Sequence, residues 1–185
     1  MLFLRQSIMV DEGELISRIT QGDKNALKEI YELHALKVYN LILNRFNDKF
    51  LADDITQDVF LKVYDKSISF RGDSQVSTWI YRIAFNKCLD ELKRRKKTIN
   101  GIDTTSYQVS AYEDEANISV NLTTILDAVD LLKQSQKDAF TLVYLDKFSQ
   151  REASEIMSMN IKAFESLLYR ARLSLQSTLS KNKGL

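Results

Sequence analysis

The sequence predicts an all-α protein with two helical domains joined by a polar linker. The chain of 185 residues has no proline and five glycines, whereas all-β folds usually need more turn residues. A chain that is poor in these two residues and rich in leucine, lysine, glutamate and alanine is typically helical. Apolar residues recur at helical spacing in two blocks, which we place at residues 11–97 and 119–181, with the linker at 98–118.

The first block opens with two helical patterns that are separated at Gly22. Leu15, Ile16 and Ile19 share one face of the first helix. Asp23 follows the break and suits the N-cap of a longer second helix. The apolar residues that keep helical spacing in this second helix are Leu27, Ile30, Tyr31, Leu33 and Leu36.

A third helix is predicted over LADDITQDVFLKVYDK, residues 51–66, with a buried face and a polar face. The residues expected in its buried face are Ile55, Val59, Phe60 and Val63. The opposite face carries Asp54, Gln57, Asp58 and Leu61. An exposed leucine flanked by acids and an amide suits contact with a basic protein partner, although a plain amphipathic surface has the same spacing.

After a loop that contains Gly72, the stretch STWIYRIAFNKCLDELKRRKK predicts the last helix of the block, residues 77–97. One stripe of this helix, expected in the core, consists of Phe85, Cys88, Leu89 and Leu92. A second stripe consists of Trp79, Arg82, Asn86 and Lys93. Residues 82–97 carry seven cations and two acids, a local net charge of +5.

This second stripe has the composition of a surface that binds single-stranded nucleic acid. Aromatic rings stack on bases, amides read base edges, and cations hold phosphates. The alternative is structural: Trp79 covers the core, and the cations at 93–97 favour the C-terminal end of the helix dipole.

Helical spacing returns after the linker and ends in a helix-turn-helix pattern. The apolar residues at this spacing are Ile125, Val129, Leu132, Phe140, Val143 and Tyr144. Ser149 and Glu152 then form an S-x-x-E capping box, which starts a short helix that reaches about Met157. After the turn at 158–160, Asn160 is placed to cap a longer helix.

The longer helix has an apolar face and a polar face near its start. The apolar face consists of Ile161, Phe164, Leu168 and Ala171. The polar face consists of Lys162, Glu165, Ser166, Tyr169 and Arg170. In a helix-turn-helix protein such a helix enters the major groove with its first residues at base edges, whereas an ordinary helical hairpin leaves the same face in water. Arg172 and Arg170 lie further along, where they suit phosphates or helix packing.

Charge and composition bound the possible functions. The net charge of +1 means that any contact with nucleic acid must come from local patches. One cysteine suits a reducing cytoplasm, and residues 1–13 lack the features of a signal peptide. No apolar run reaches the length of a membrane span. We expect no catalytic site, metal or cofactor, because His34 and Cys88 have no second metal ligand nearby and no glycine-rich phosphate loop is present.

Three motifs, in order along the chain, resemble the extracytoplasmic-function group of bacterial sigma factors, which keep the second and fourth conserved regions of the superfamily. ADDITQDVFLKVY (52–64) resembles the helix that binds core RNA polymerase. FRGDSQVSTWIYRIAFNKCLDELKRRKK (70–97) resembles the promoter-melting segment, and FSQREASEIMSMNIKAFESLLYRARLSL (148–175) resembles the helix-turn-helix that reads −35 DNA. Tyr64 stands where tryptophan is usual, Phe85 where arginine is frequent, and Glu165 where some members carry a basic residue.

The resemblance implies a transcription initiation factor in the cytoplasm, not an enzyme, with no small-molecule substrate. Its implied partners are core RNA polymerase, the −35 duplex, the unpaired −10 strand and an anti-sigma factor. The implied polymerase-binding residues are Asp54, Gln57, Asp58 and Leu61. Those for −10 DNA are Arg71, Ser74, Trp79, Arg82, Asn86, Lys93, Arg94 and Arg95. Those for −35 DNA are Lys162, Glu165, Ser166, Tyr169, Arg170 and Arg172.

An alternative class is a two-domain regulator, in which an all-helical sensing or dimerisation domain is joined to a helix-turn-helix. Co-purification with polymerase separates the two classes, because a sensing regulator has no need to compete for the sigma site.

Overall fold

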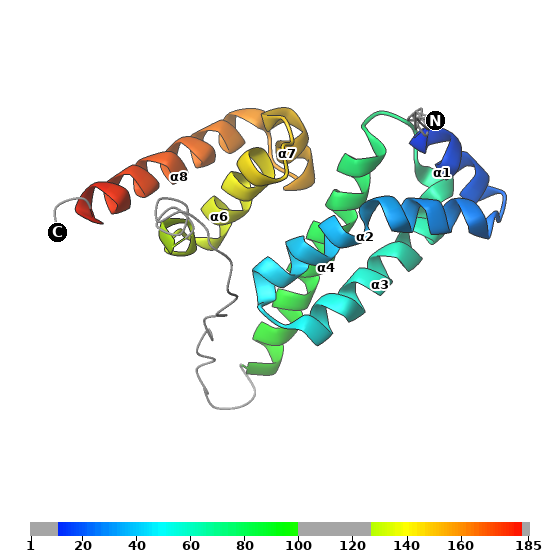
Figure 1. The fold of residues 1–185 in the computed structure, drawn as a ribbon, viewed down its shortest axis with the longest axis horizontal. Coiled ribbons are helices and arrows are strands. Elements are labelled where there is room, and N and C mark those ends of the chain that lie inside the picture. The colour runs from blue at the N-terminus through cyan, green and yellow to red at the C-terminus, as the bar shows by residue number, and fades with distance from the viewer. Residues whose placement is uncertain (1–10, 100–126, 183–185) are drawn as a thin grey trace, which may run out of the picture. The chain divides into compact units, whose positions relative to one another are not determined.

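The computed structural model of the protein describes residues 11–99 and 127–182 (Figure 1). Every regular element in these two ranges is a helix, which confirms the predicted all-α fold. The chain divides into two units, unit 1 up to Ile102 and unit 2 from Asp103. From residue 100 onward the predicted linker lies outside the described residues, so its bounds and those of the domains stay a prediction. No helix in the described ranges has the length and apolar composition that a membrane span requires.

Unit 1 begins with two helices that start at aspartate caps. Helix α1 spans Glu12–Thr20, and the side chain of Asp11 accepts hydrogen bonds from the amides of its first turn. Helix α2 spans Lys24–Phe46, and Asp23 accepts from the amide of Asn25 at 2.8 Å. Gly22 has φ +86°, a conformation that glycine adopts without strain, so the predicted break between the two helices is confirmed.

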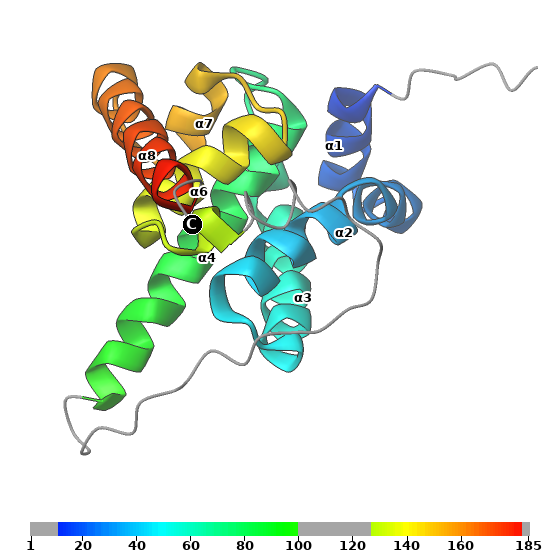
Figure 2. The ribbon, with the colours of Figure 1, turned by 60° about the vertical axis from the view of Figure 1, so that its left-hand side comes forward.

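Three further elements complete unit 1. Helix α3 spans Lys49–Lys66, the 3₁₀ turn η1 spans Ser67–Ser69, and helix α4 spans Val76–Ile99. Helix α2 packs against α1, α3 and α4, helix α3 packs against α4, and η1 packs against α1 and α3 (Figure 1). The C-terminal turns of α4 project beyond the other helices of this unit (Figure 2).

The interior of unit 1 is apolar and is built largely from the predicted stripes. Its fully buried aliphatic side chains include Ile16, Ile19, Ile30, Ile42, Val59 and Ile80. Leu33 and Leu36 of α2 keep helical spacing but are exposed, because the buried positions of this helix are set by Ile30, His34 and Val38. Spacing alone therefore places the helix correctly but assigns part of its surface to the core.

His34 is a buried polar residue at the contact between α1 and α2. Its Nε2 lies 3.1 Å from Oε2 of Glu12, and its Nδ1 is buried with no hydrogen-bond partner among the described residues. Burial lowers the pKa of His34; the carboxylate of Glu12 acts in the opposite direction, and Lys37 adds to the lowering. The neutral imidazole, which donates from Nε2 to Glu12, is therefore the favoured form in the folded chain.

We expect His34 to make the stability of unit 1 sensitive to mild acid. Its folded-state pKa lies below the ordinary value of 6.5, so its contribution is complete above pH 6.5 and is lost as pH falls toward the folded-state pKa. Urea unfolding, followed by the fluorescence of the single tryptophan, should show a steeper loss of stability below that pH in the wild type than in His34→Gln. Equal slopes in the two proteins would contradict this assignment.

Unit 2 contains the predicted helix-turn-helix. Residues 127–130 are helical, helix α6 spans Gln134–Phe140, and a π turn, η2, spans Thr141–Leu145. Helix α7 spans Gln150–Ile156 and begins at the predicted capping box of Ser149 and Glu152. Helix α8 spans Ile161–Asn182, and Oδ1 of Asn160 accepts from the amide of Ala163 at 2.9 Å. Both predicted caps are therefore confirmed.

Helix α8 packs against α6 and α7, with a small apolar core between them. Its fully buried side chains include Phe164, Leu168 and Ala171, as predicted. Ile161 differs from the prediction because the first residue of the helix lies at the edge of the core, where it is 39% exposed. Leu167, which the predicted stripe omits, is buried instead.

Candidate polymerase and nucleic-acid interfaces

The face of α3 opposite the core carries the four residues that we call the α3 surface: Asp54, Gln57, Asp58 and Leu61. All four are exposed, whereas Ile55 and Val59 on the other side of the helix are buried. Leu61 is 65% exposed, so a partner that covers it would gain the free energy of burying an apolar side chain. The structure therefore brings the predicted polymerase-binding residues together on one accessible face.

An apolar groove of about 400 Å³ continues from the α3 surface toward α2. Its floor includes Tyr31 and Phe60, whose rings meet edge to face with centroids 4.8 Å apart. Gln57 and Leu61 line its α3 side, and Lys24 and Lys28 of α2 line its other side. A side chain that projects from a partner could therefore bury apolar area beside the α3 surface.

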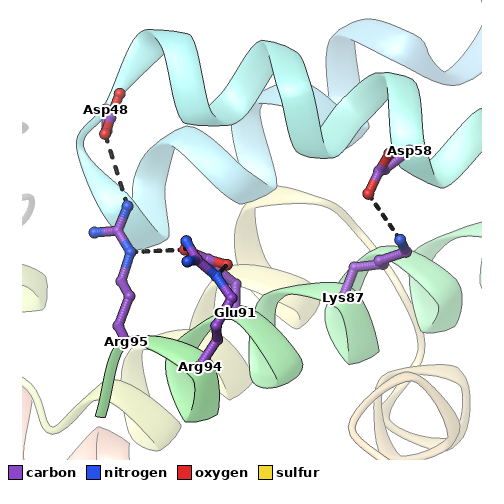
Figure 3. A network of polar contacts seen from close by, with 6 residues as sticks. All are labelled: Asp48, Asp58, Lys87, Glu91, Arg94 and Arg95. Carbon is purple, nitrogen blue, oxygen red and sulfur yellow. Dashed lines mark hydrogen bonds and ion pairs between the residues drawn. The ribbon is translucent and has the colours of Figure 1, made fainter. Parts of the chain in front are cut away.

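Asp58 also makes an ion pair within the protein. Its Oδ2 lies 2.8 Å from Nζ of Lys87 on α4 (Figure 3). The pair joins a residue of the α3 surface to the helix that carries the predicted −10 residues. A partner that binds Asp58 must therefore compete with Lys87 or share this carboxylate.

Helix α4 exposes most of the predicted −10 residues. Arg82, Asn86 and Lys93 lie on the solvent side, while Phe85 and Cys88 are buried. In the loop before the helix, Arg71 is exposed and Ser74 is half-buried. An amide and several cations thus share one accessible side of α4 and its preceding loop, which suits contacts to base edges and phosphates.

Near the end of α4, Glu91 holds the two arginines that follow it. Arg94 donates from Nε and Nη2 to the two carboxylate oxygens of Glu91, at 2.7 and 2.8 Å. Arg95 donates from Nε to Oε1 of Glu91 at 2.9 Å and lies 3.8 Å from Asp48 at the start of α3 (Figure 3). The hydrogen bonds from Arg94, aided by those from Arg95, lower the pKa of Glu91, which is therefore a carboxylate at neutral pH.

In unit 2, the first turns of α8 present the predicted −35 residues to solvent. Lys162, Glu165, Ser166 and Tyr169 are all exposed on the side away from Phe164. Among them they offer an ammonium group, a carboxylate and hydroxyl groups within three turns of the helix start. These groups can donate to and accept from base edges in a major groove.

The two arginines further along α8 make internal contacts. Nε of Arg170 donates to the carbonyl of Ser166 at 3.2 Å. Nε of Arg172 donates to the hydroxyl of Tyr144 at 2.6 Å, and its guanidinium lies 5.5 Å from the centre of that ring. Of the two predicted roles for Arg172, phosphate contact or packing, the structure provides the packing contact, which ties α8 to η2.

Comparison with known protein families places both units in one superfamily. The family model described as Sigma-70 region 2 matches residues 30–98, and the one described as Sigma-70, region 4 matches residues 122–175. The chain is 30% identical over 158 residues to the ECF RNA polymerase sigma factor SigM of Bacillus subtilis, which covers 84% of this chain and 96% of SigM. The chain belongs to the ECF RNA polymerase sigma factors.

Other relatives and solved structures resemble this sigma factor along most of its length. It is 26% identical over 175 residues to the ECF RNA polymerase sigma-E factor of Escherichia coli K12, covering 88% of this chain and 91% of that relative. The fold matches the sigma factor RpoE of Bartonella quintana, solved with the anti-sigma factor NepR, at a TM-score of 0.71 and 24% identity over 83% of this chain and 96% of RpoE. It also matches CnrH, solved with the cytosolic domain of CnrY, at a TM-score of 0.67 and 19% identity over 92% and 97% of the two chains.

The predicted placement of Trp79 on the exposed stripe of this sigma factor is wrong. Its side chain is 5% exposed and packs against Phe70, with ring centroids 5.1 Å apart. Trp79 lies in the first turn of α4, where Phe70, just after η1, packs against it. Arg82 and Asn86 lie further along the same stripe and are exposed. The structural alternative for this residue therefore describes its position.

Two features of the sigma factor's interfaces escape the sequence prediction. Glu91 is spaced three and four residues before Arg94 and Arg95, a helical ion-pair spacing that was visible in the sequence. The pairs Asp58–Lys87 and Asp48–Arg95 join residues on different helices, so no local pattern reveals them.

Proposed function

We propose that this sigma factor binds core RNA polymerase through the α3 surface, holds the unpaired −10 strand with α4 and its preceding loop, and reads −35 DNA with the start of α8. The observation that carries this assignment is the orientation of three helices that match the family's motifs. Each turns its apolar residues inward and its polar motif residues outward. The contacts with polymerase, −10 DNA and −35 DNA are thereby assigned to exposed faces on three different helices.

At −35, the short helix α7, the turn and the longer helix α8 have the order of a DNA-reading helix-turn-helix, whose second helix lies in the major groove. Lys162 can donate to O6 and N7 of a guanine, and Glu165 can accept from the amino group of a cytosine. Ser166 and Tyr169 lie beside them with hydroxyl groups for the neighbouring base pairs or phosphates.

At −10, opening the duplex costs about 1.4 kcal/mol for each base-pair step. Because Trp79 is buried, we assign the compensating contacts to the exposed Asn86, Arg82 and Arg71 and to the cations at the end of α4. The amide would read a base edge and the cations would hold the backbone of the released strand. Ser74, half-buried in the loop, would serve as a backbone donor.

We further propose that the protein acts in the cytoplasm and is controlled by an anti-sigma factor. RpoE was solved in complex with the anti-sigma factor NepR, and CnrH in complex with the cytosolic domain of CnrY, which supports this proposal by analogy of fold. The net charge of +1 suits a factor that searches for promoters as part of the holoenzyme and binds DNA weakly alone. The alternative, a sensing domain joined to a helix-turn-helix, is not favoured because Sigma-70 region 2 occupies the block where that domain would lie.

A promoter library transcribed in vitro tests both the function and the reading face. Core polymerase with this chain should produce promoter-specific transcripts from a library randomised at −35, whereas core polymerase alone should not. Glu165→Ala should relax the preference at one base pair, which corresponds to about 1–3 kcal/mol of discrimination. A wild type without specific transcripts would contradict the function. Unchanged base preference in Glu165→Ala would contradict the reading face while leaving the function intact.

A further inference from the structure

Glu91 occupies the Nε and Nη2 edge of Arg94, one of the edges to which a phosphate can bind. A guanidinium presents a planar fork of donors that binds carboxylate and phosphate in the same bidentate manner. Glu91 takes two donors of this fork at 2.7 and 2.8 Å, so it is an intramolecular stand-in for phosphate. A backbone phosphate that takes the same bidentate position must displace it.

The two arginines on Glu91 differ in exposure: the side chain of Arg94 is 69% exposed and that of Arg95 is 41% exposed. Arg95 contacts Asp48 as well as Glu91, and its guanidinium lies 5.2 Å from the centre of the Phe46 ring. These contacts anchor Arg95 where α2 ends and α3 begins. The more exposed Arg94 pairs with Glu91 on the same helix turn at 2.7 Å.

This difference allows the pairing to be exchanged without leaving a charge uncompensated. The side chain of Glu91 is 12% exposed, so this carboxylate would be costly to leave unpaired. If Arg94 turns away to a phosphate, the hydrogen bond from Arg95 to Oε1 of Glu91 remains. Arg95 thus keeps the charge of the carboxylate paired while Arg94, the donor to Oε2, changes partner.

We propose that Glu91 is a positioning residue that holds Arg94 in reserve and limits its contact with the DNA backbone, while Arg95 anchors the pair to the rest of unit 1. The proposal rests on the proposed −10 role of α4 and adds to it a residue that weakens, rather than strengthens, the grip on DNA. A weaker contact with the DNA backbone lowers the part of the binding free energy that is independent of sequence. Base contacts then decide a larger share of the affinity for each promoter.

The test measures the affinity of holoenzyme variants for a fluorescent single DNA strand of mixed sequence. Each variant is titrated at several salt concentrations between about 50 and 200 mM. Glu91→Gln removes the charge but keeps the shape of the side chain. It should raise affinity several-fold at low salt and steepen the plot of log K against log salt by about 0.7, the value for one additional phosphate contact on a single strand. Core polymerase without the sigma chain gives the baseline at each salt concentration.

Asp90→Asn is the matched control. It removes one negative charge from the neighbouring residue, whose contact with Lys93 is a single one at 3.4 Å between side chains that are both largely exposed. We expect a small, general rise in affinity and no change of slope. A second comparison uses Glu91→Gln in an Arg94→Ala background, where the gain in affinity and slope should vanish because the arginine to be released is absent.

The outcomes separate this proposal from the proposed function. If Arg94→Ala binds the strand as well as the wild type does, the −10 role of the end of α4 is wrong. If Arg94→Ala binds more weakly but Glu91→Gln behaves like Asp90→Asn, the −10 role stands and the role of Glu91 is wrong. Thermal unfolding of each variant shows whether the fold is retained, and the double variant still decides the matter if Glu91→Gln lowers stability.

Discussion

Replacing Trp79 by alanine should lower the free energy of unfolding of unit 1 by about 3–5 kcal/mol, the usual cost of removing a large aromatic side chain from a core. The reason is its burial against Phe70 at the first turn of α4. Total stabilities of domains are about 5–15 kcal/mol, so this loss is a large fraction of the total free energy of unfolding. Urea unfolding followed by far-ultraviolet circular dichroism measures the effect.

The conservative variant Trp79→Phe separates packing from a direct role in DNA opening. A phenylalanine keeps a ring beside Phe70, so most of the stability should return, and permanganate reactivity of unpaired thymines near −10 should stay close to that of the wild type. A Trp79→Ala protein of normal stability, or a stable Trp79→Phe protein that fails to open DNA, would show that the indole ring acts on the strand itself.

The second large effect is expected at the α3 surface. Gln57→Ala combined with Asp58→Lys should weaken binding to core polymerase by about 1–3 kcal/mol, or about 5- to 150-fold in Kd. The double variant removes one hydrogen-bonding amide and reverses an exposed charge beside Leu61. It also places two ammonium groups together, because Asp58 normally pairs with Lys87. Fluorescence titration of labelled sigma factor against core polymerase, without DNA, measures the change.

Lys87→Ala is the control for this experiment. It breaks the same ion pair with Asp58 but keeps the carboxylate, so it should bind polymerase nearly as well as the wild type. Exposed ion pairs contribute at most about 1 kcal/mol to stability, so neither protein should unfold. Equal affinities of the wild type and the double variant would contradict the assignment of the α3 surface to polymerase.

Local patterns predicted most of the helices because the physical causes of a helix start lie within a few residues. The caps at Asp23, at Ser149 with Glu152, and at Asn160 all involve hydrogen bonds over two or three residues, so the sequence contains both partners. The exposed faces of α3 and α8 were predicted for a similar reason. Helical periodicity separates the two sides of a helix when one side consistently carries charge.

Contacts between segments that are distant in the chain could not be predicted in this way. The position of Trp79 depends on where Phe70 folds, and a helical wheel that starts at the tryptophan contains no information about the preceding loop. Likewise, Lys87 and Asp58 are 29 residues apart, and their pairing follows from the way α3 packs on α4. The contact of Arg172 with Tyr144 likewise joins residues 28 positions apart, so no local pattern reveals it.

The two ion pairs between α3 and α4 have a geometrical consequence. Asp48 faces Arg95 and Asp58 faces Lys87, so the helices run antiparallel and are joined at two points roughly 12–15 Å apart along their axes, at 1.5 Å per residue. Under the proposed roles of α3 and α4, the packing of these two helices against each other therefore sets the distance between the polymerase contact and the DNA contact.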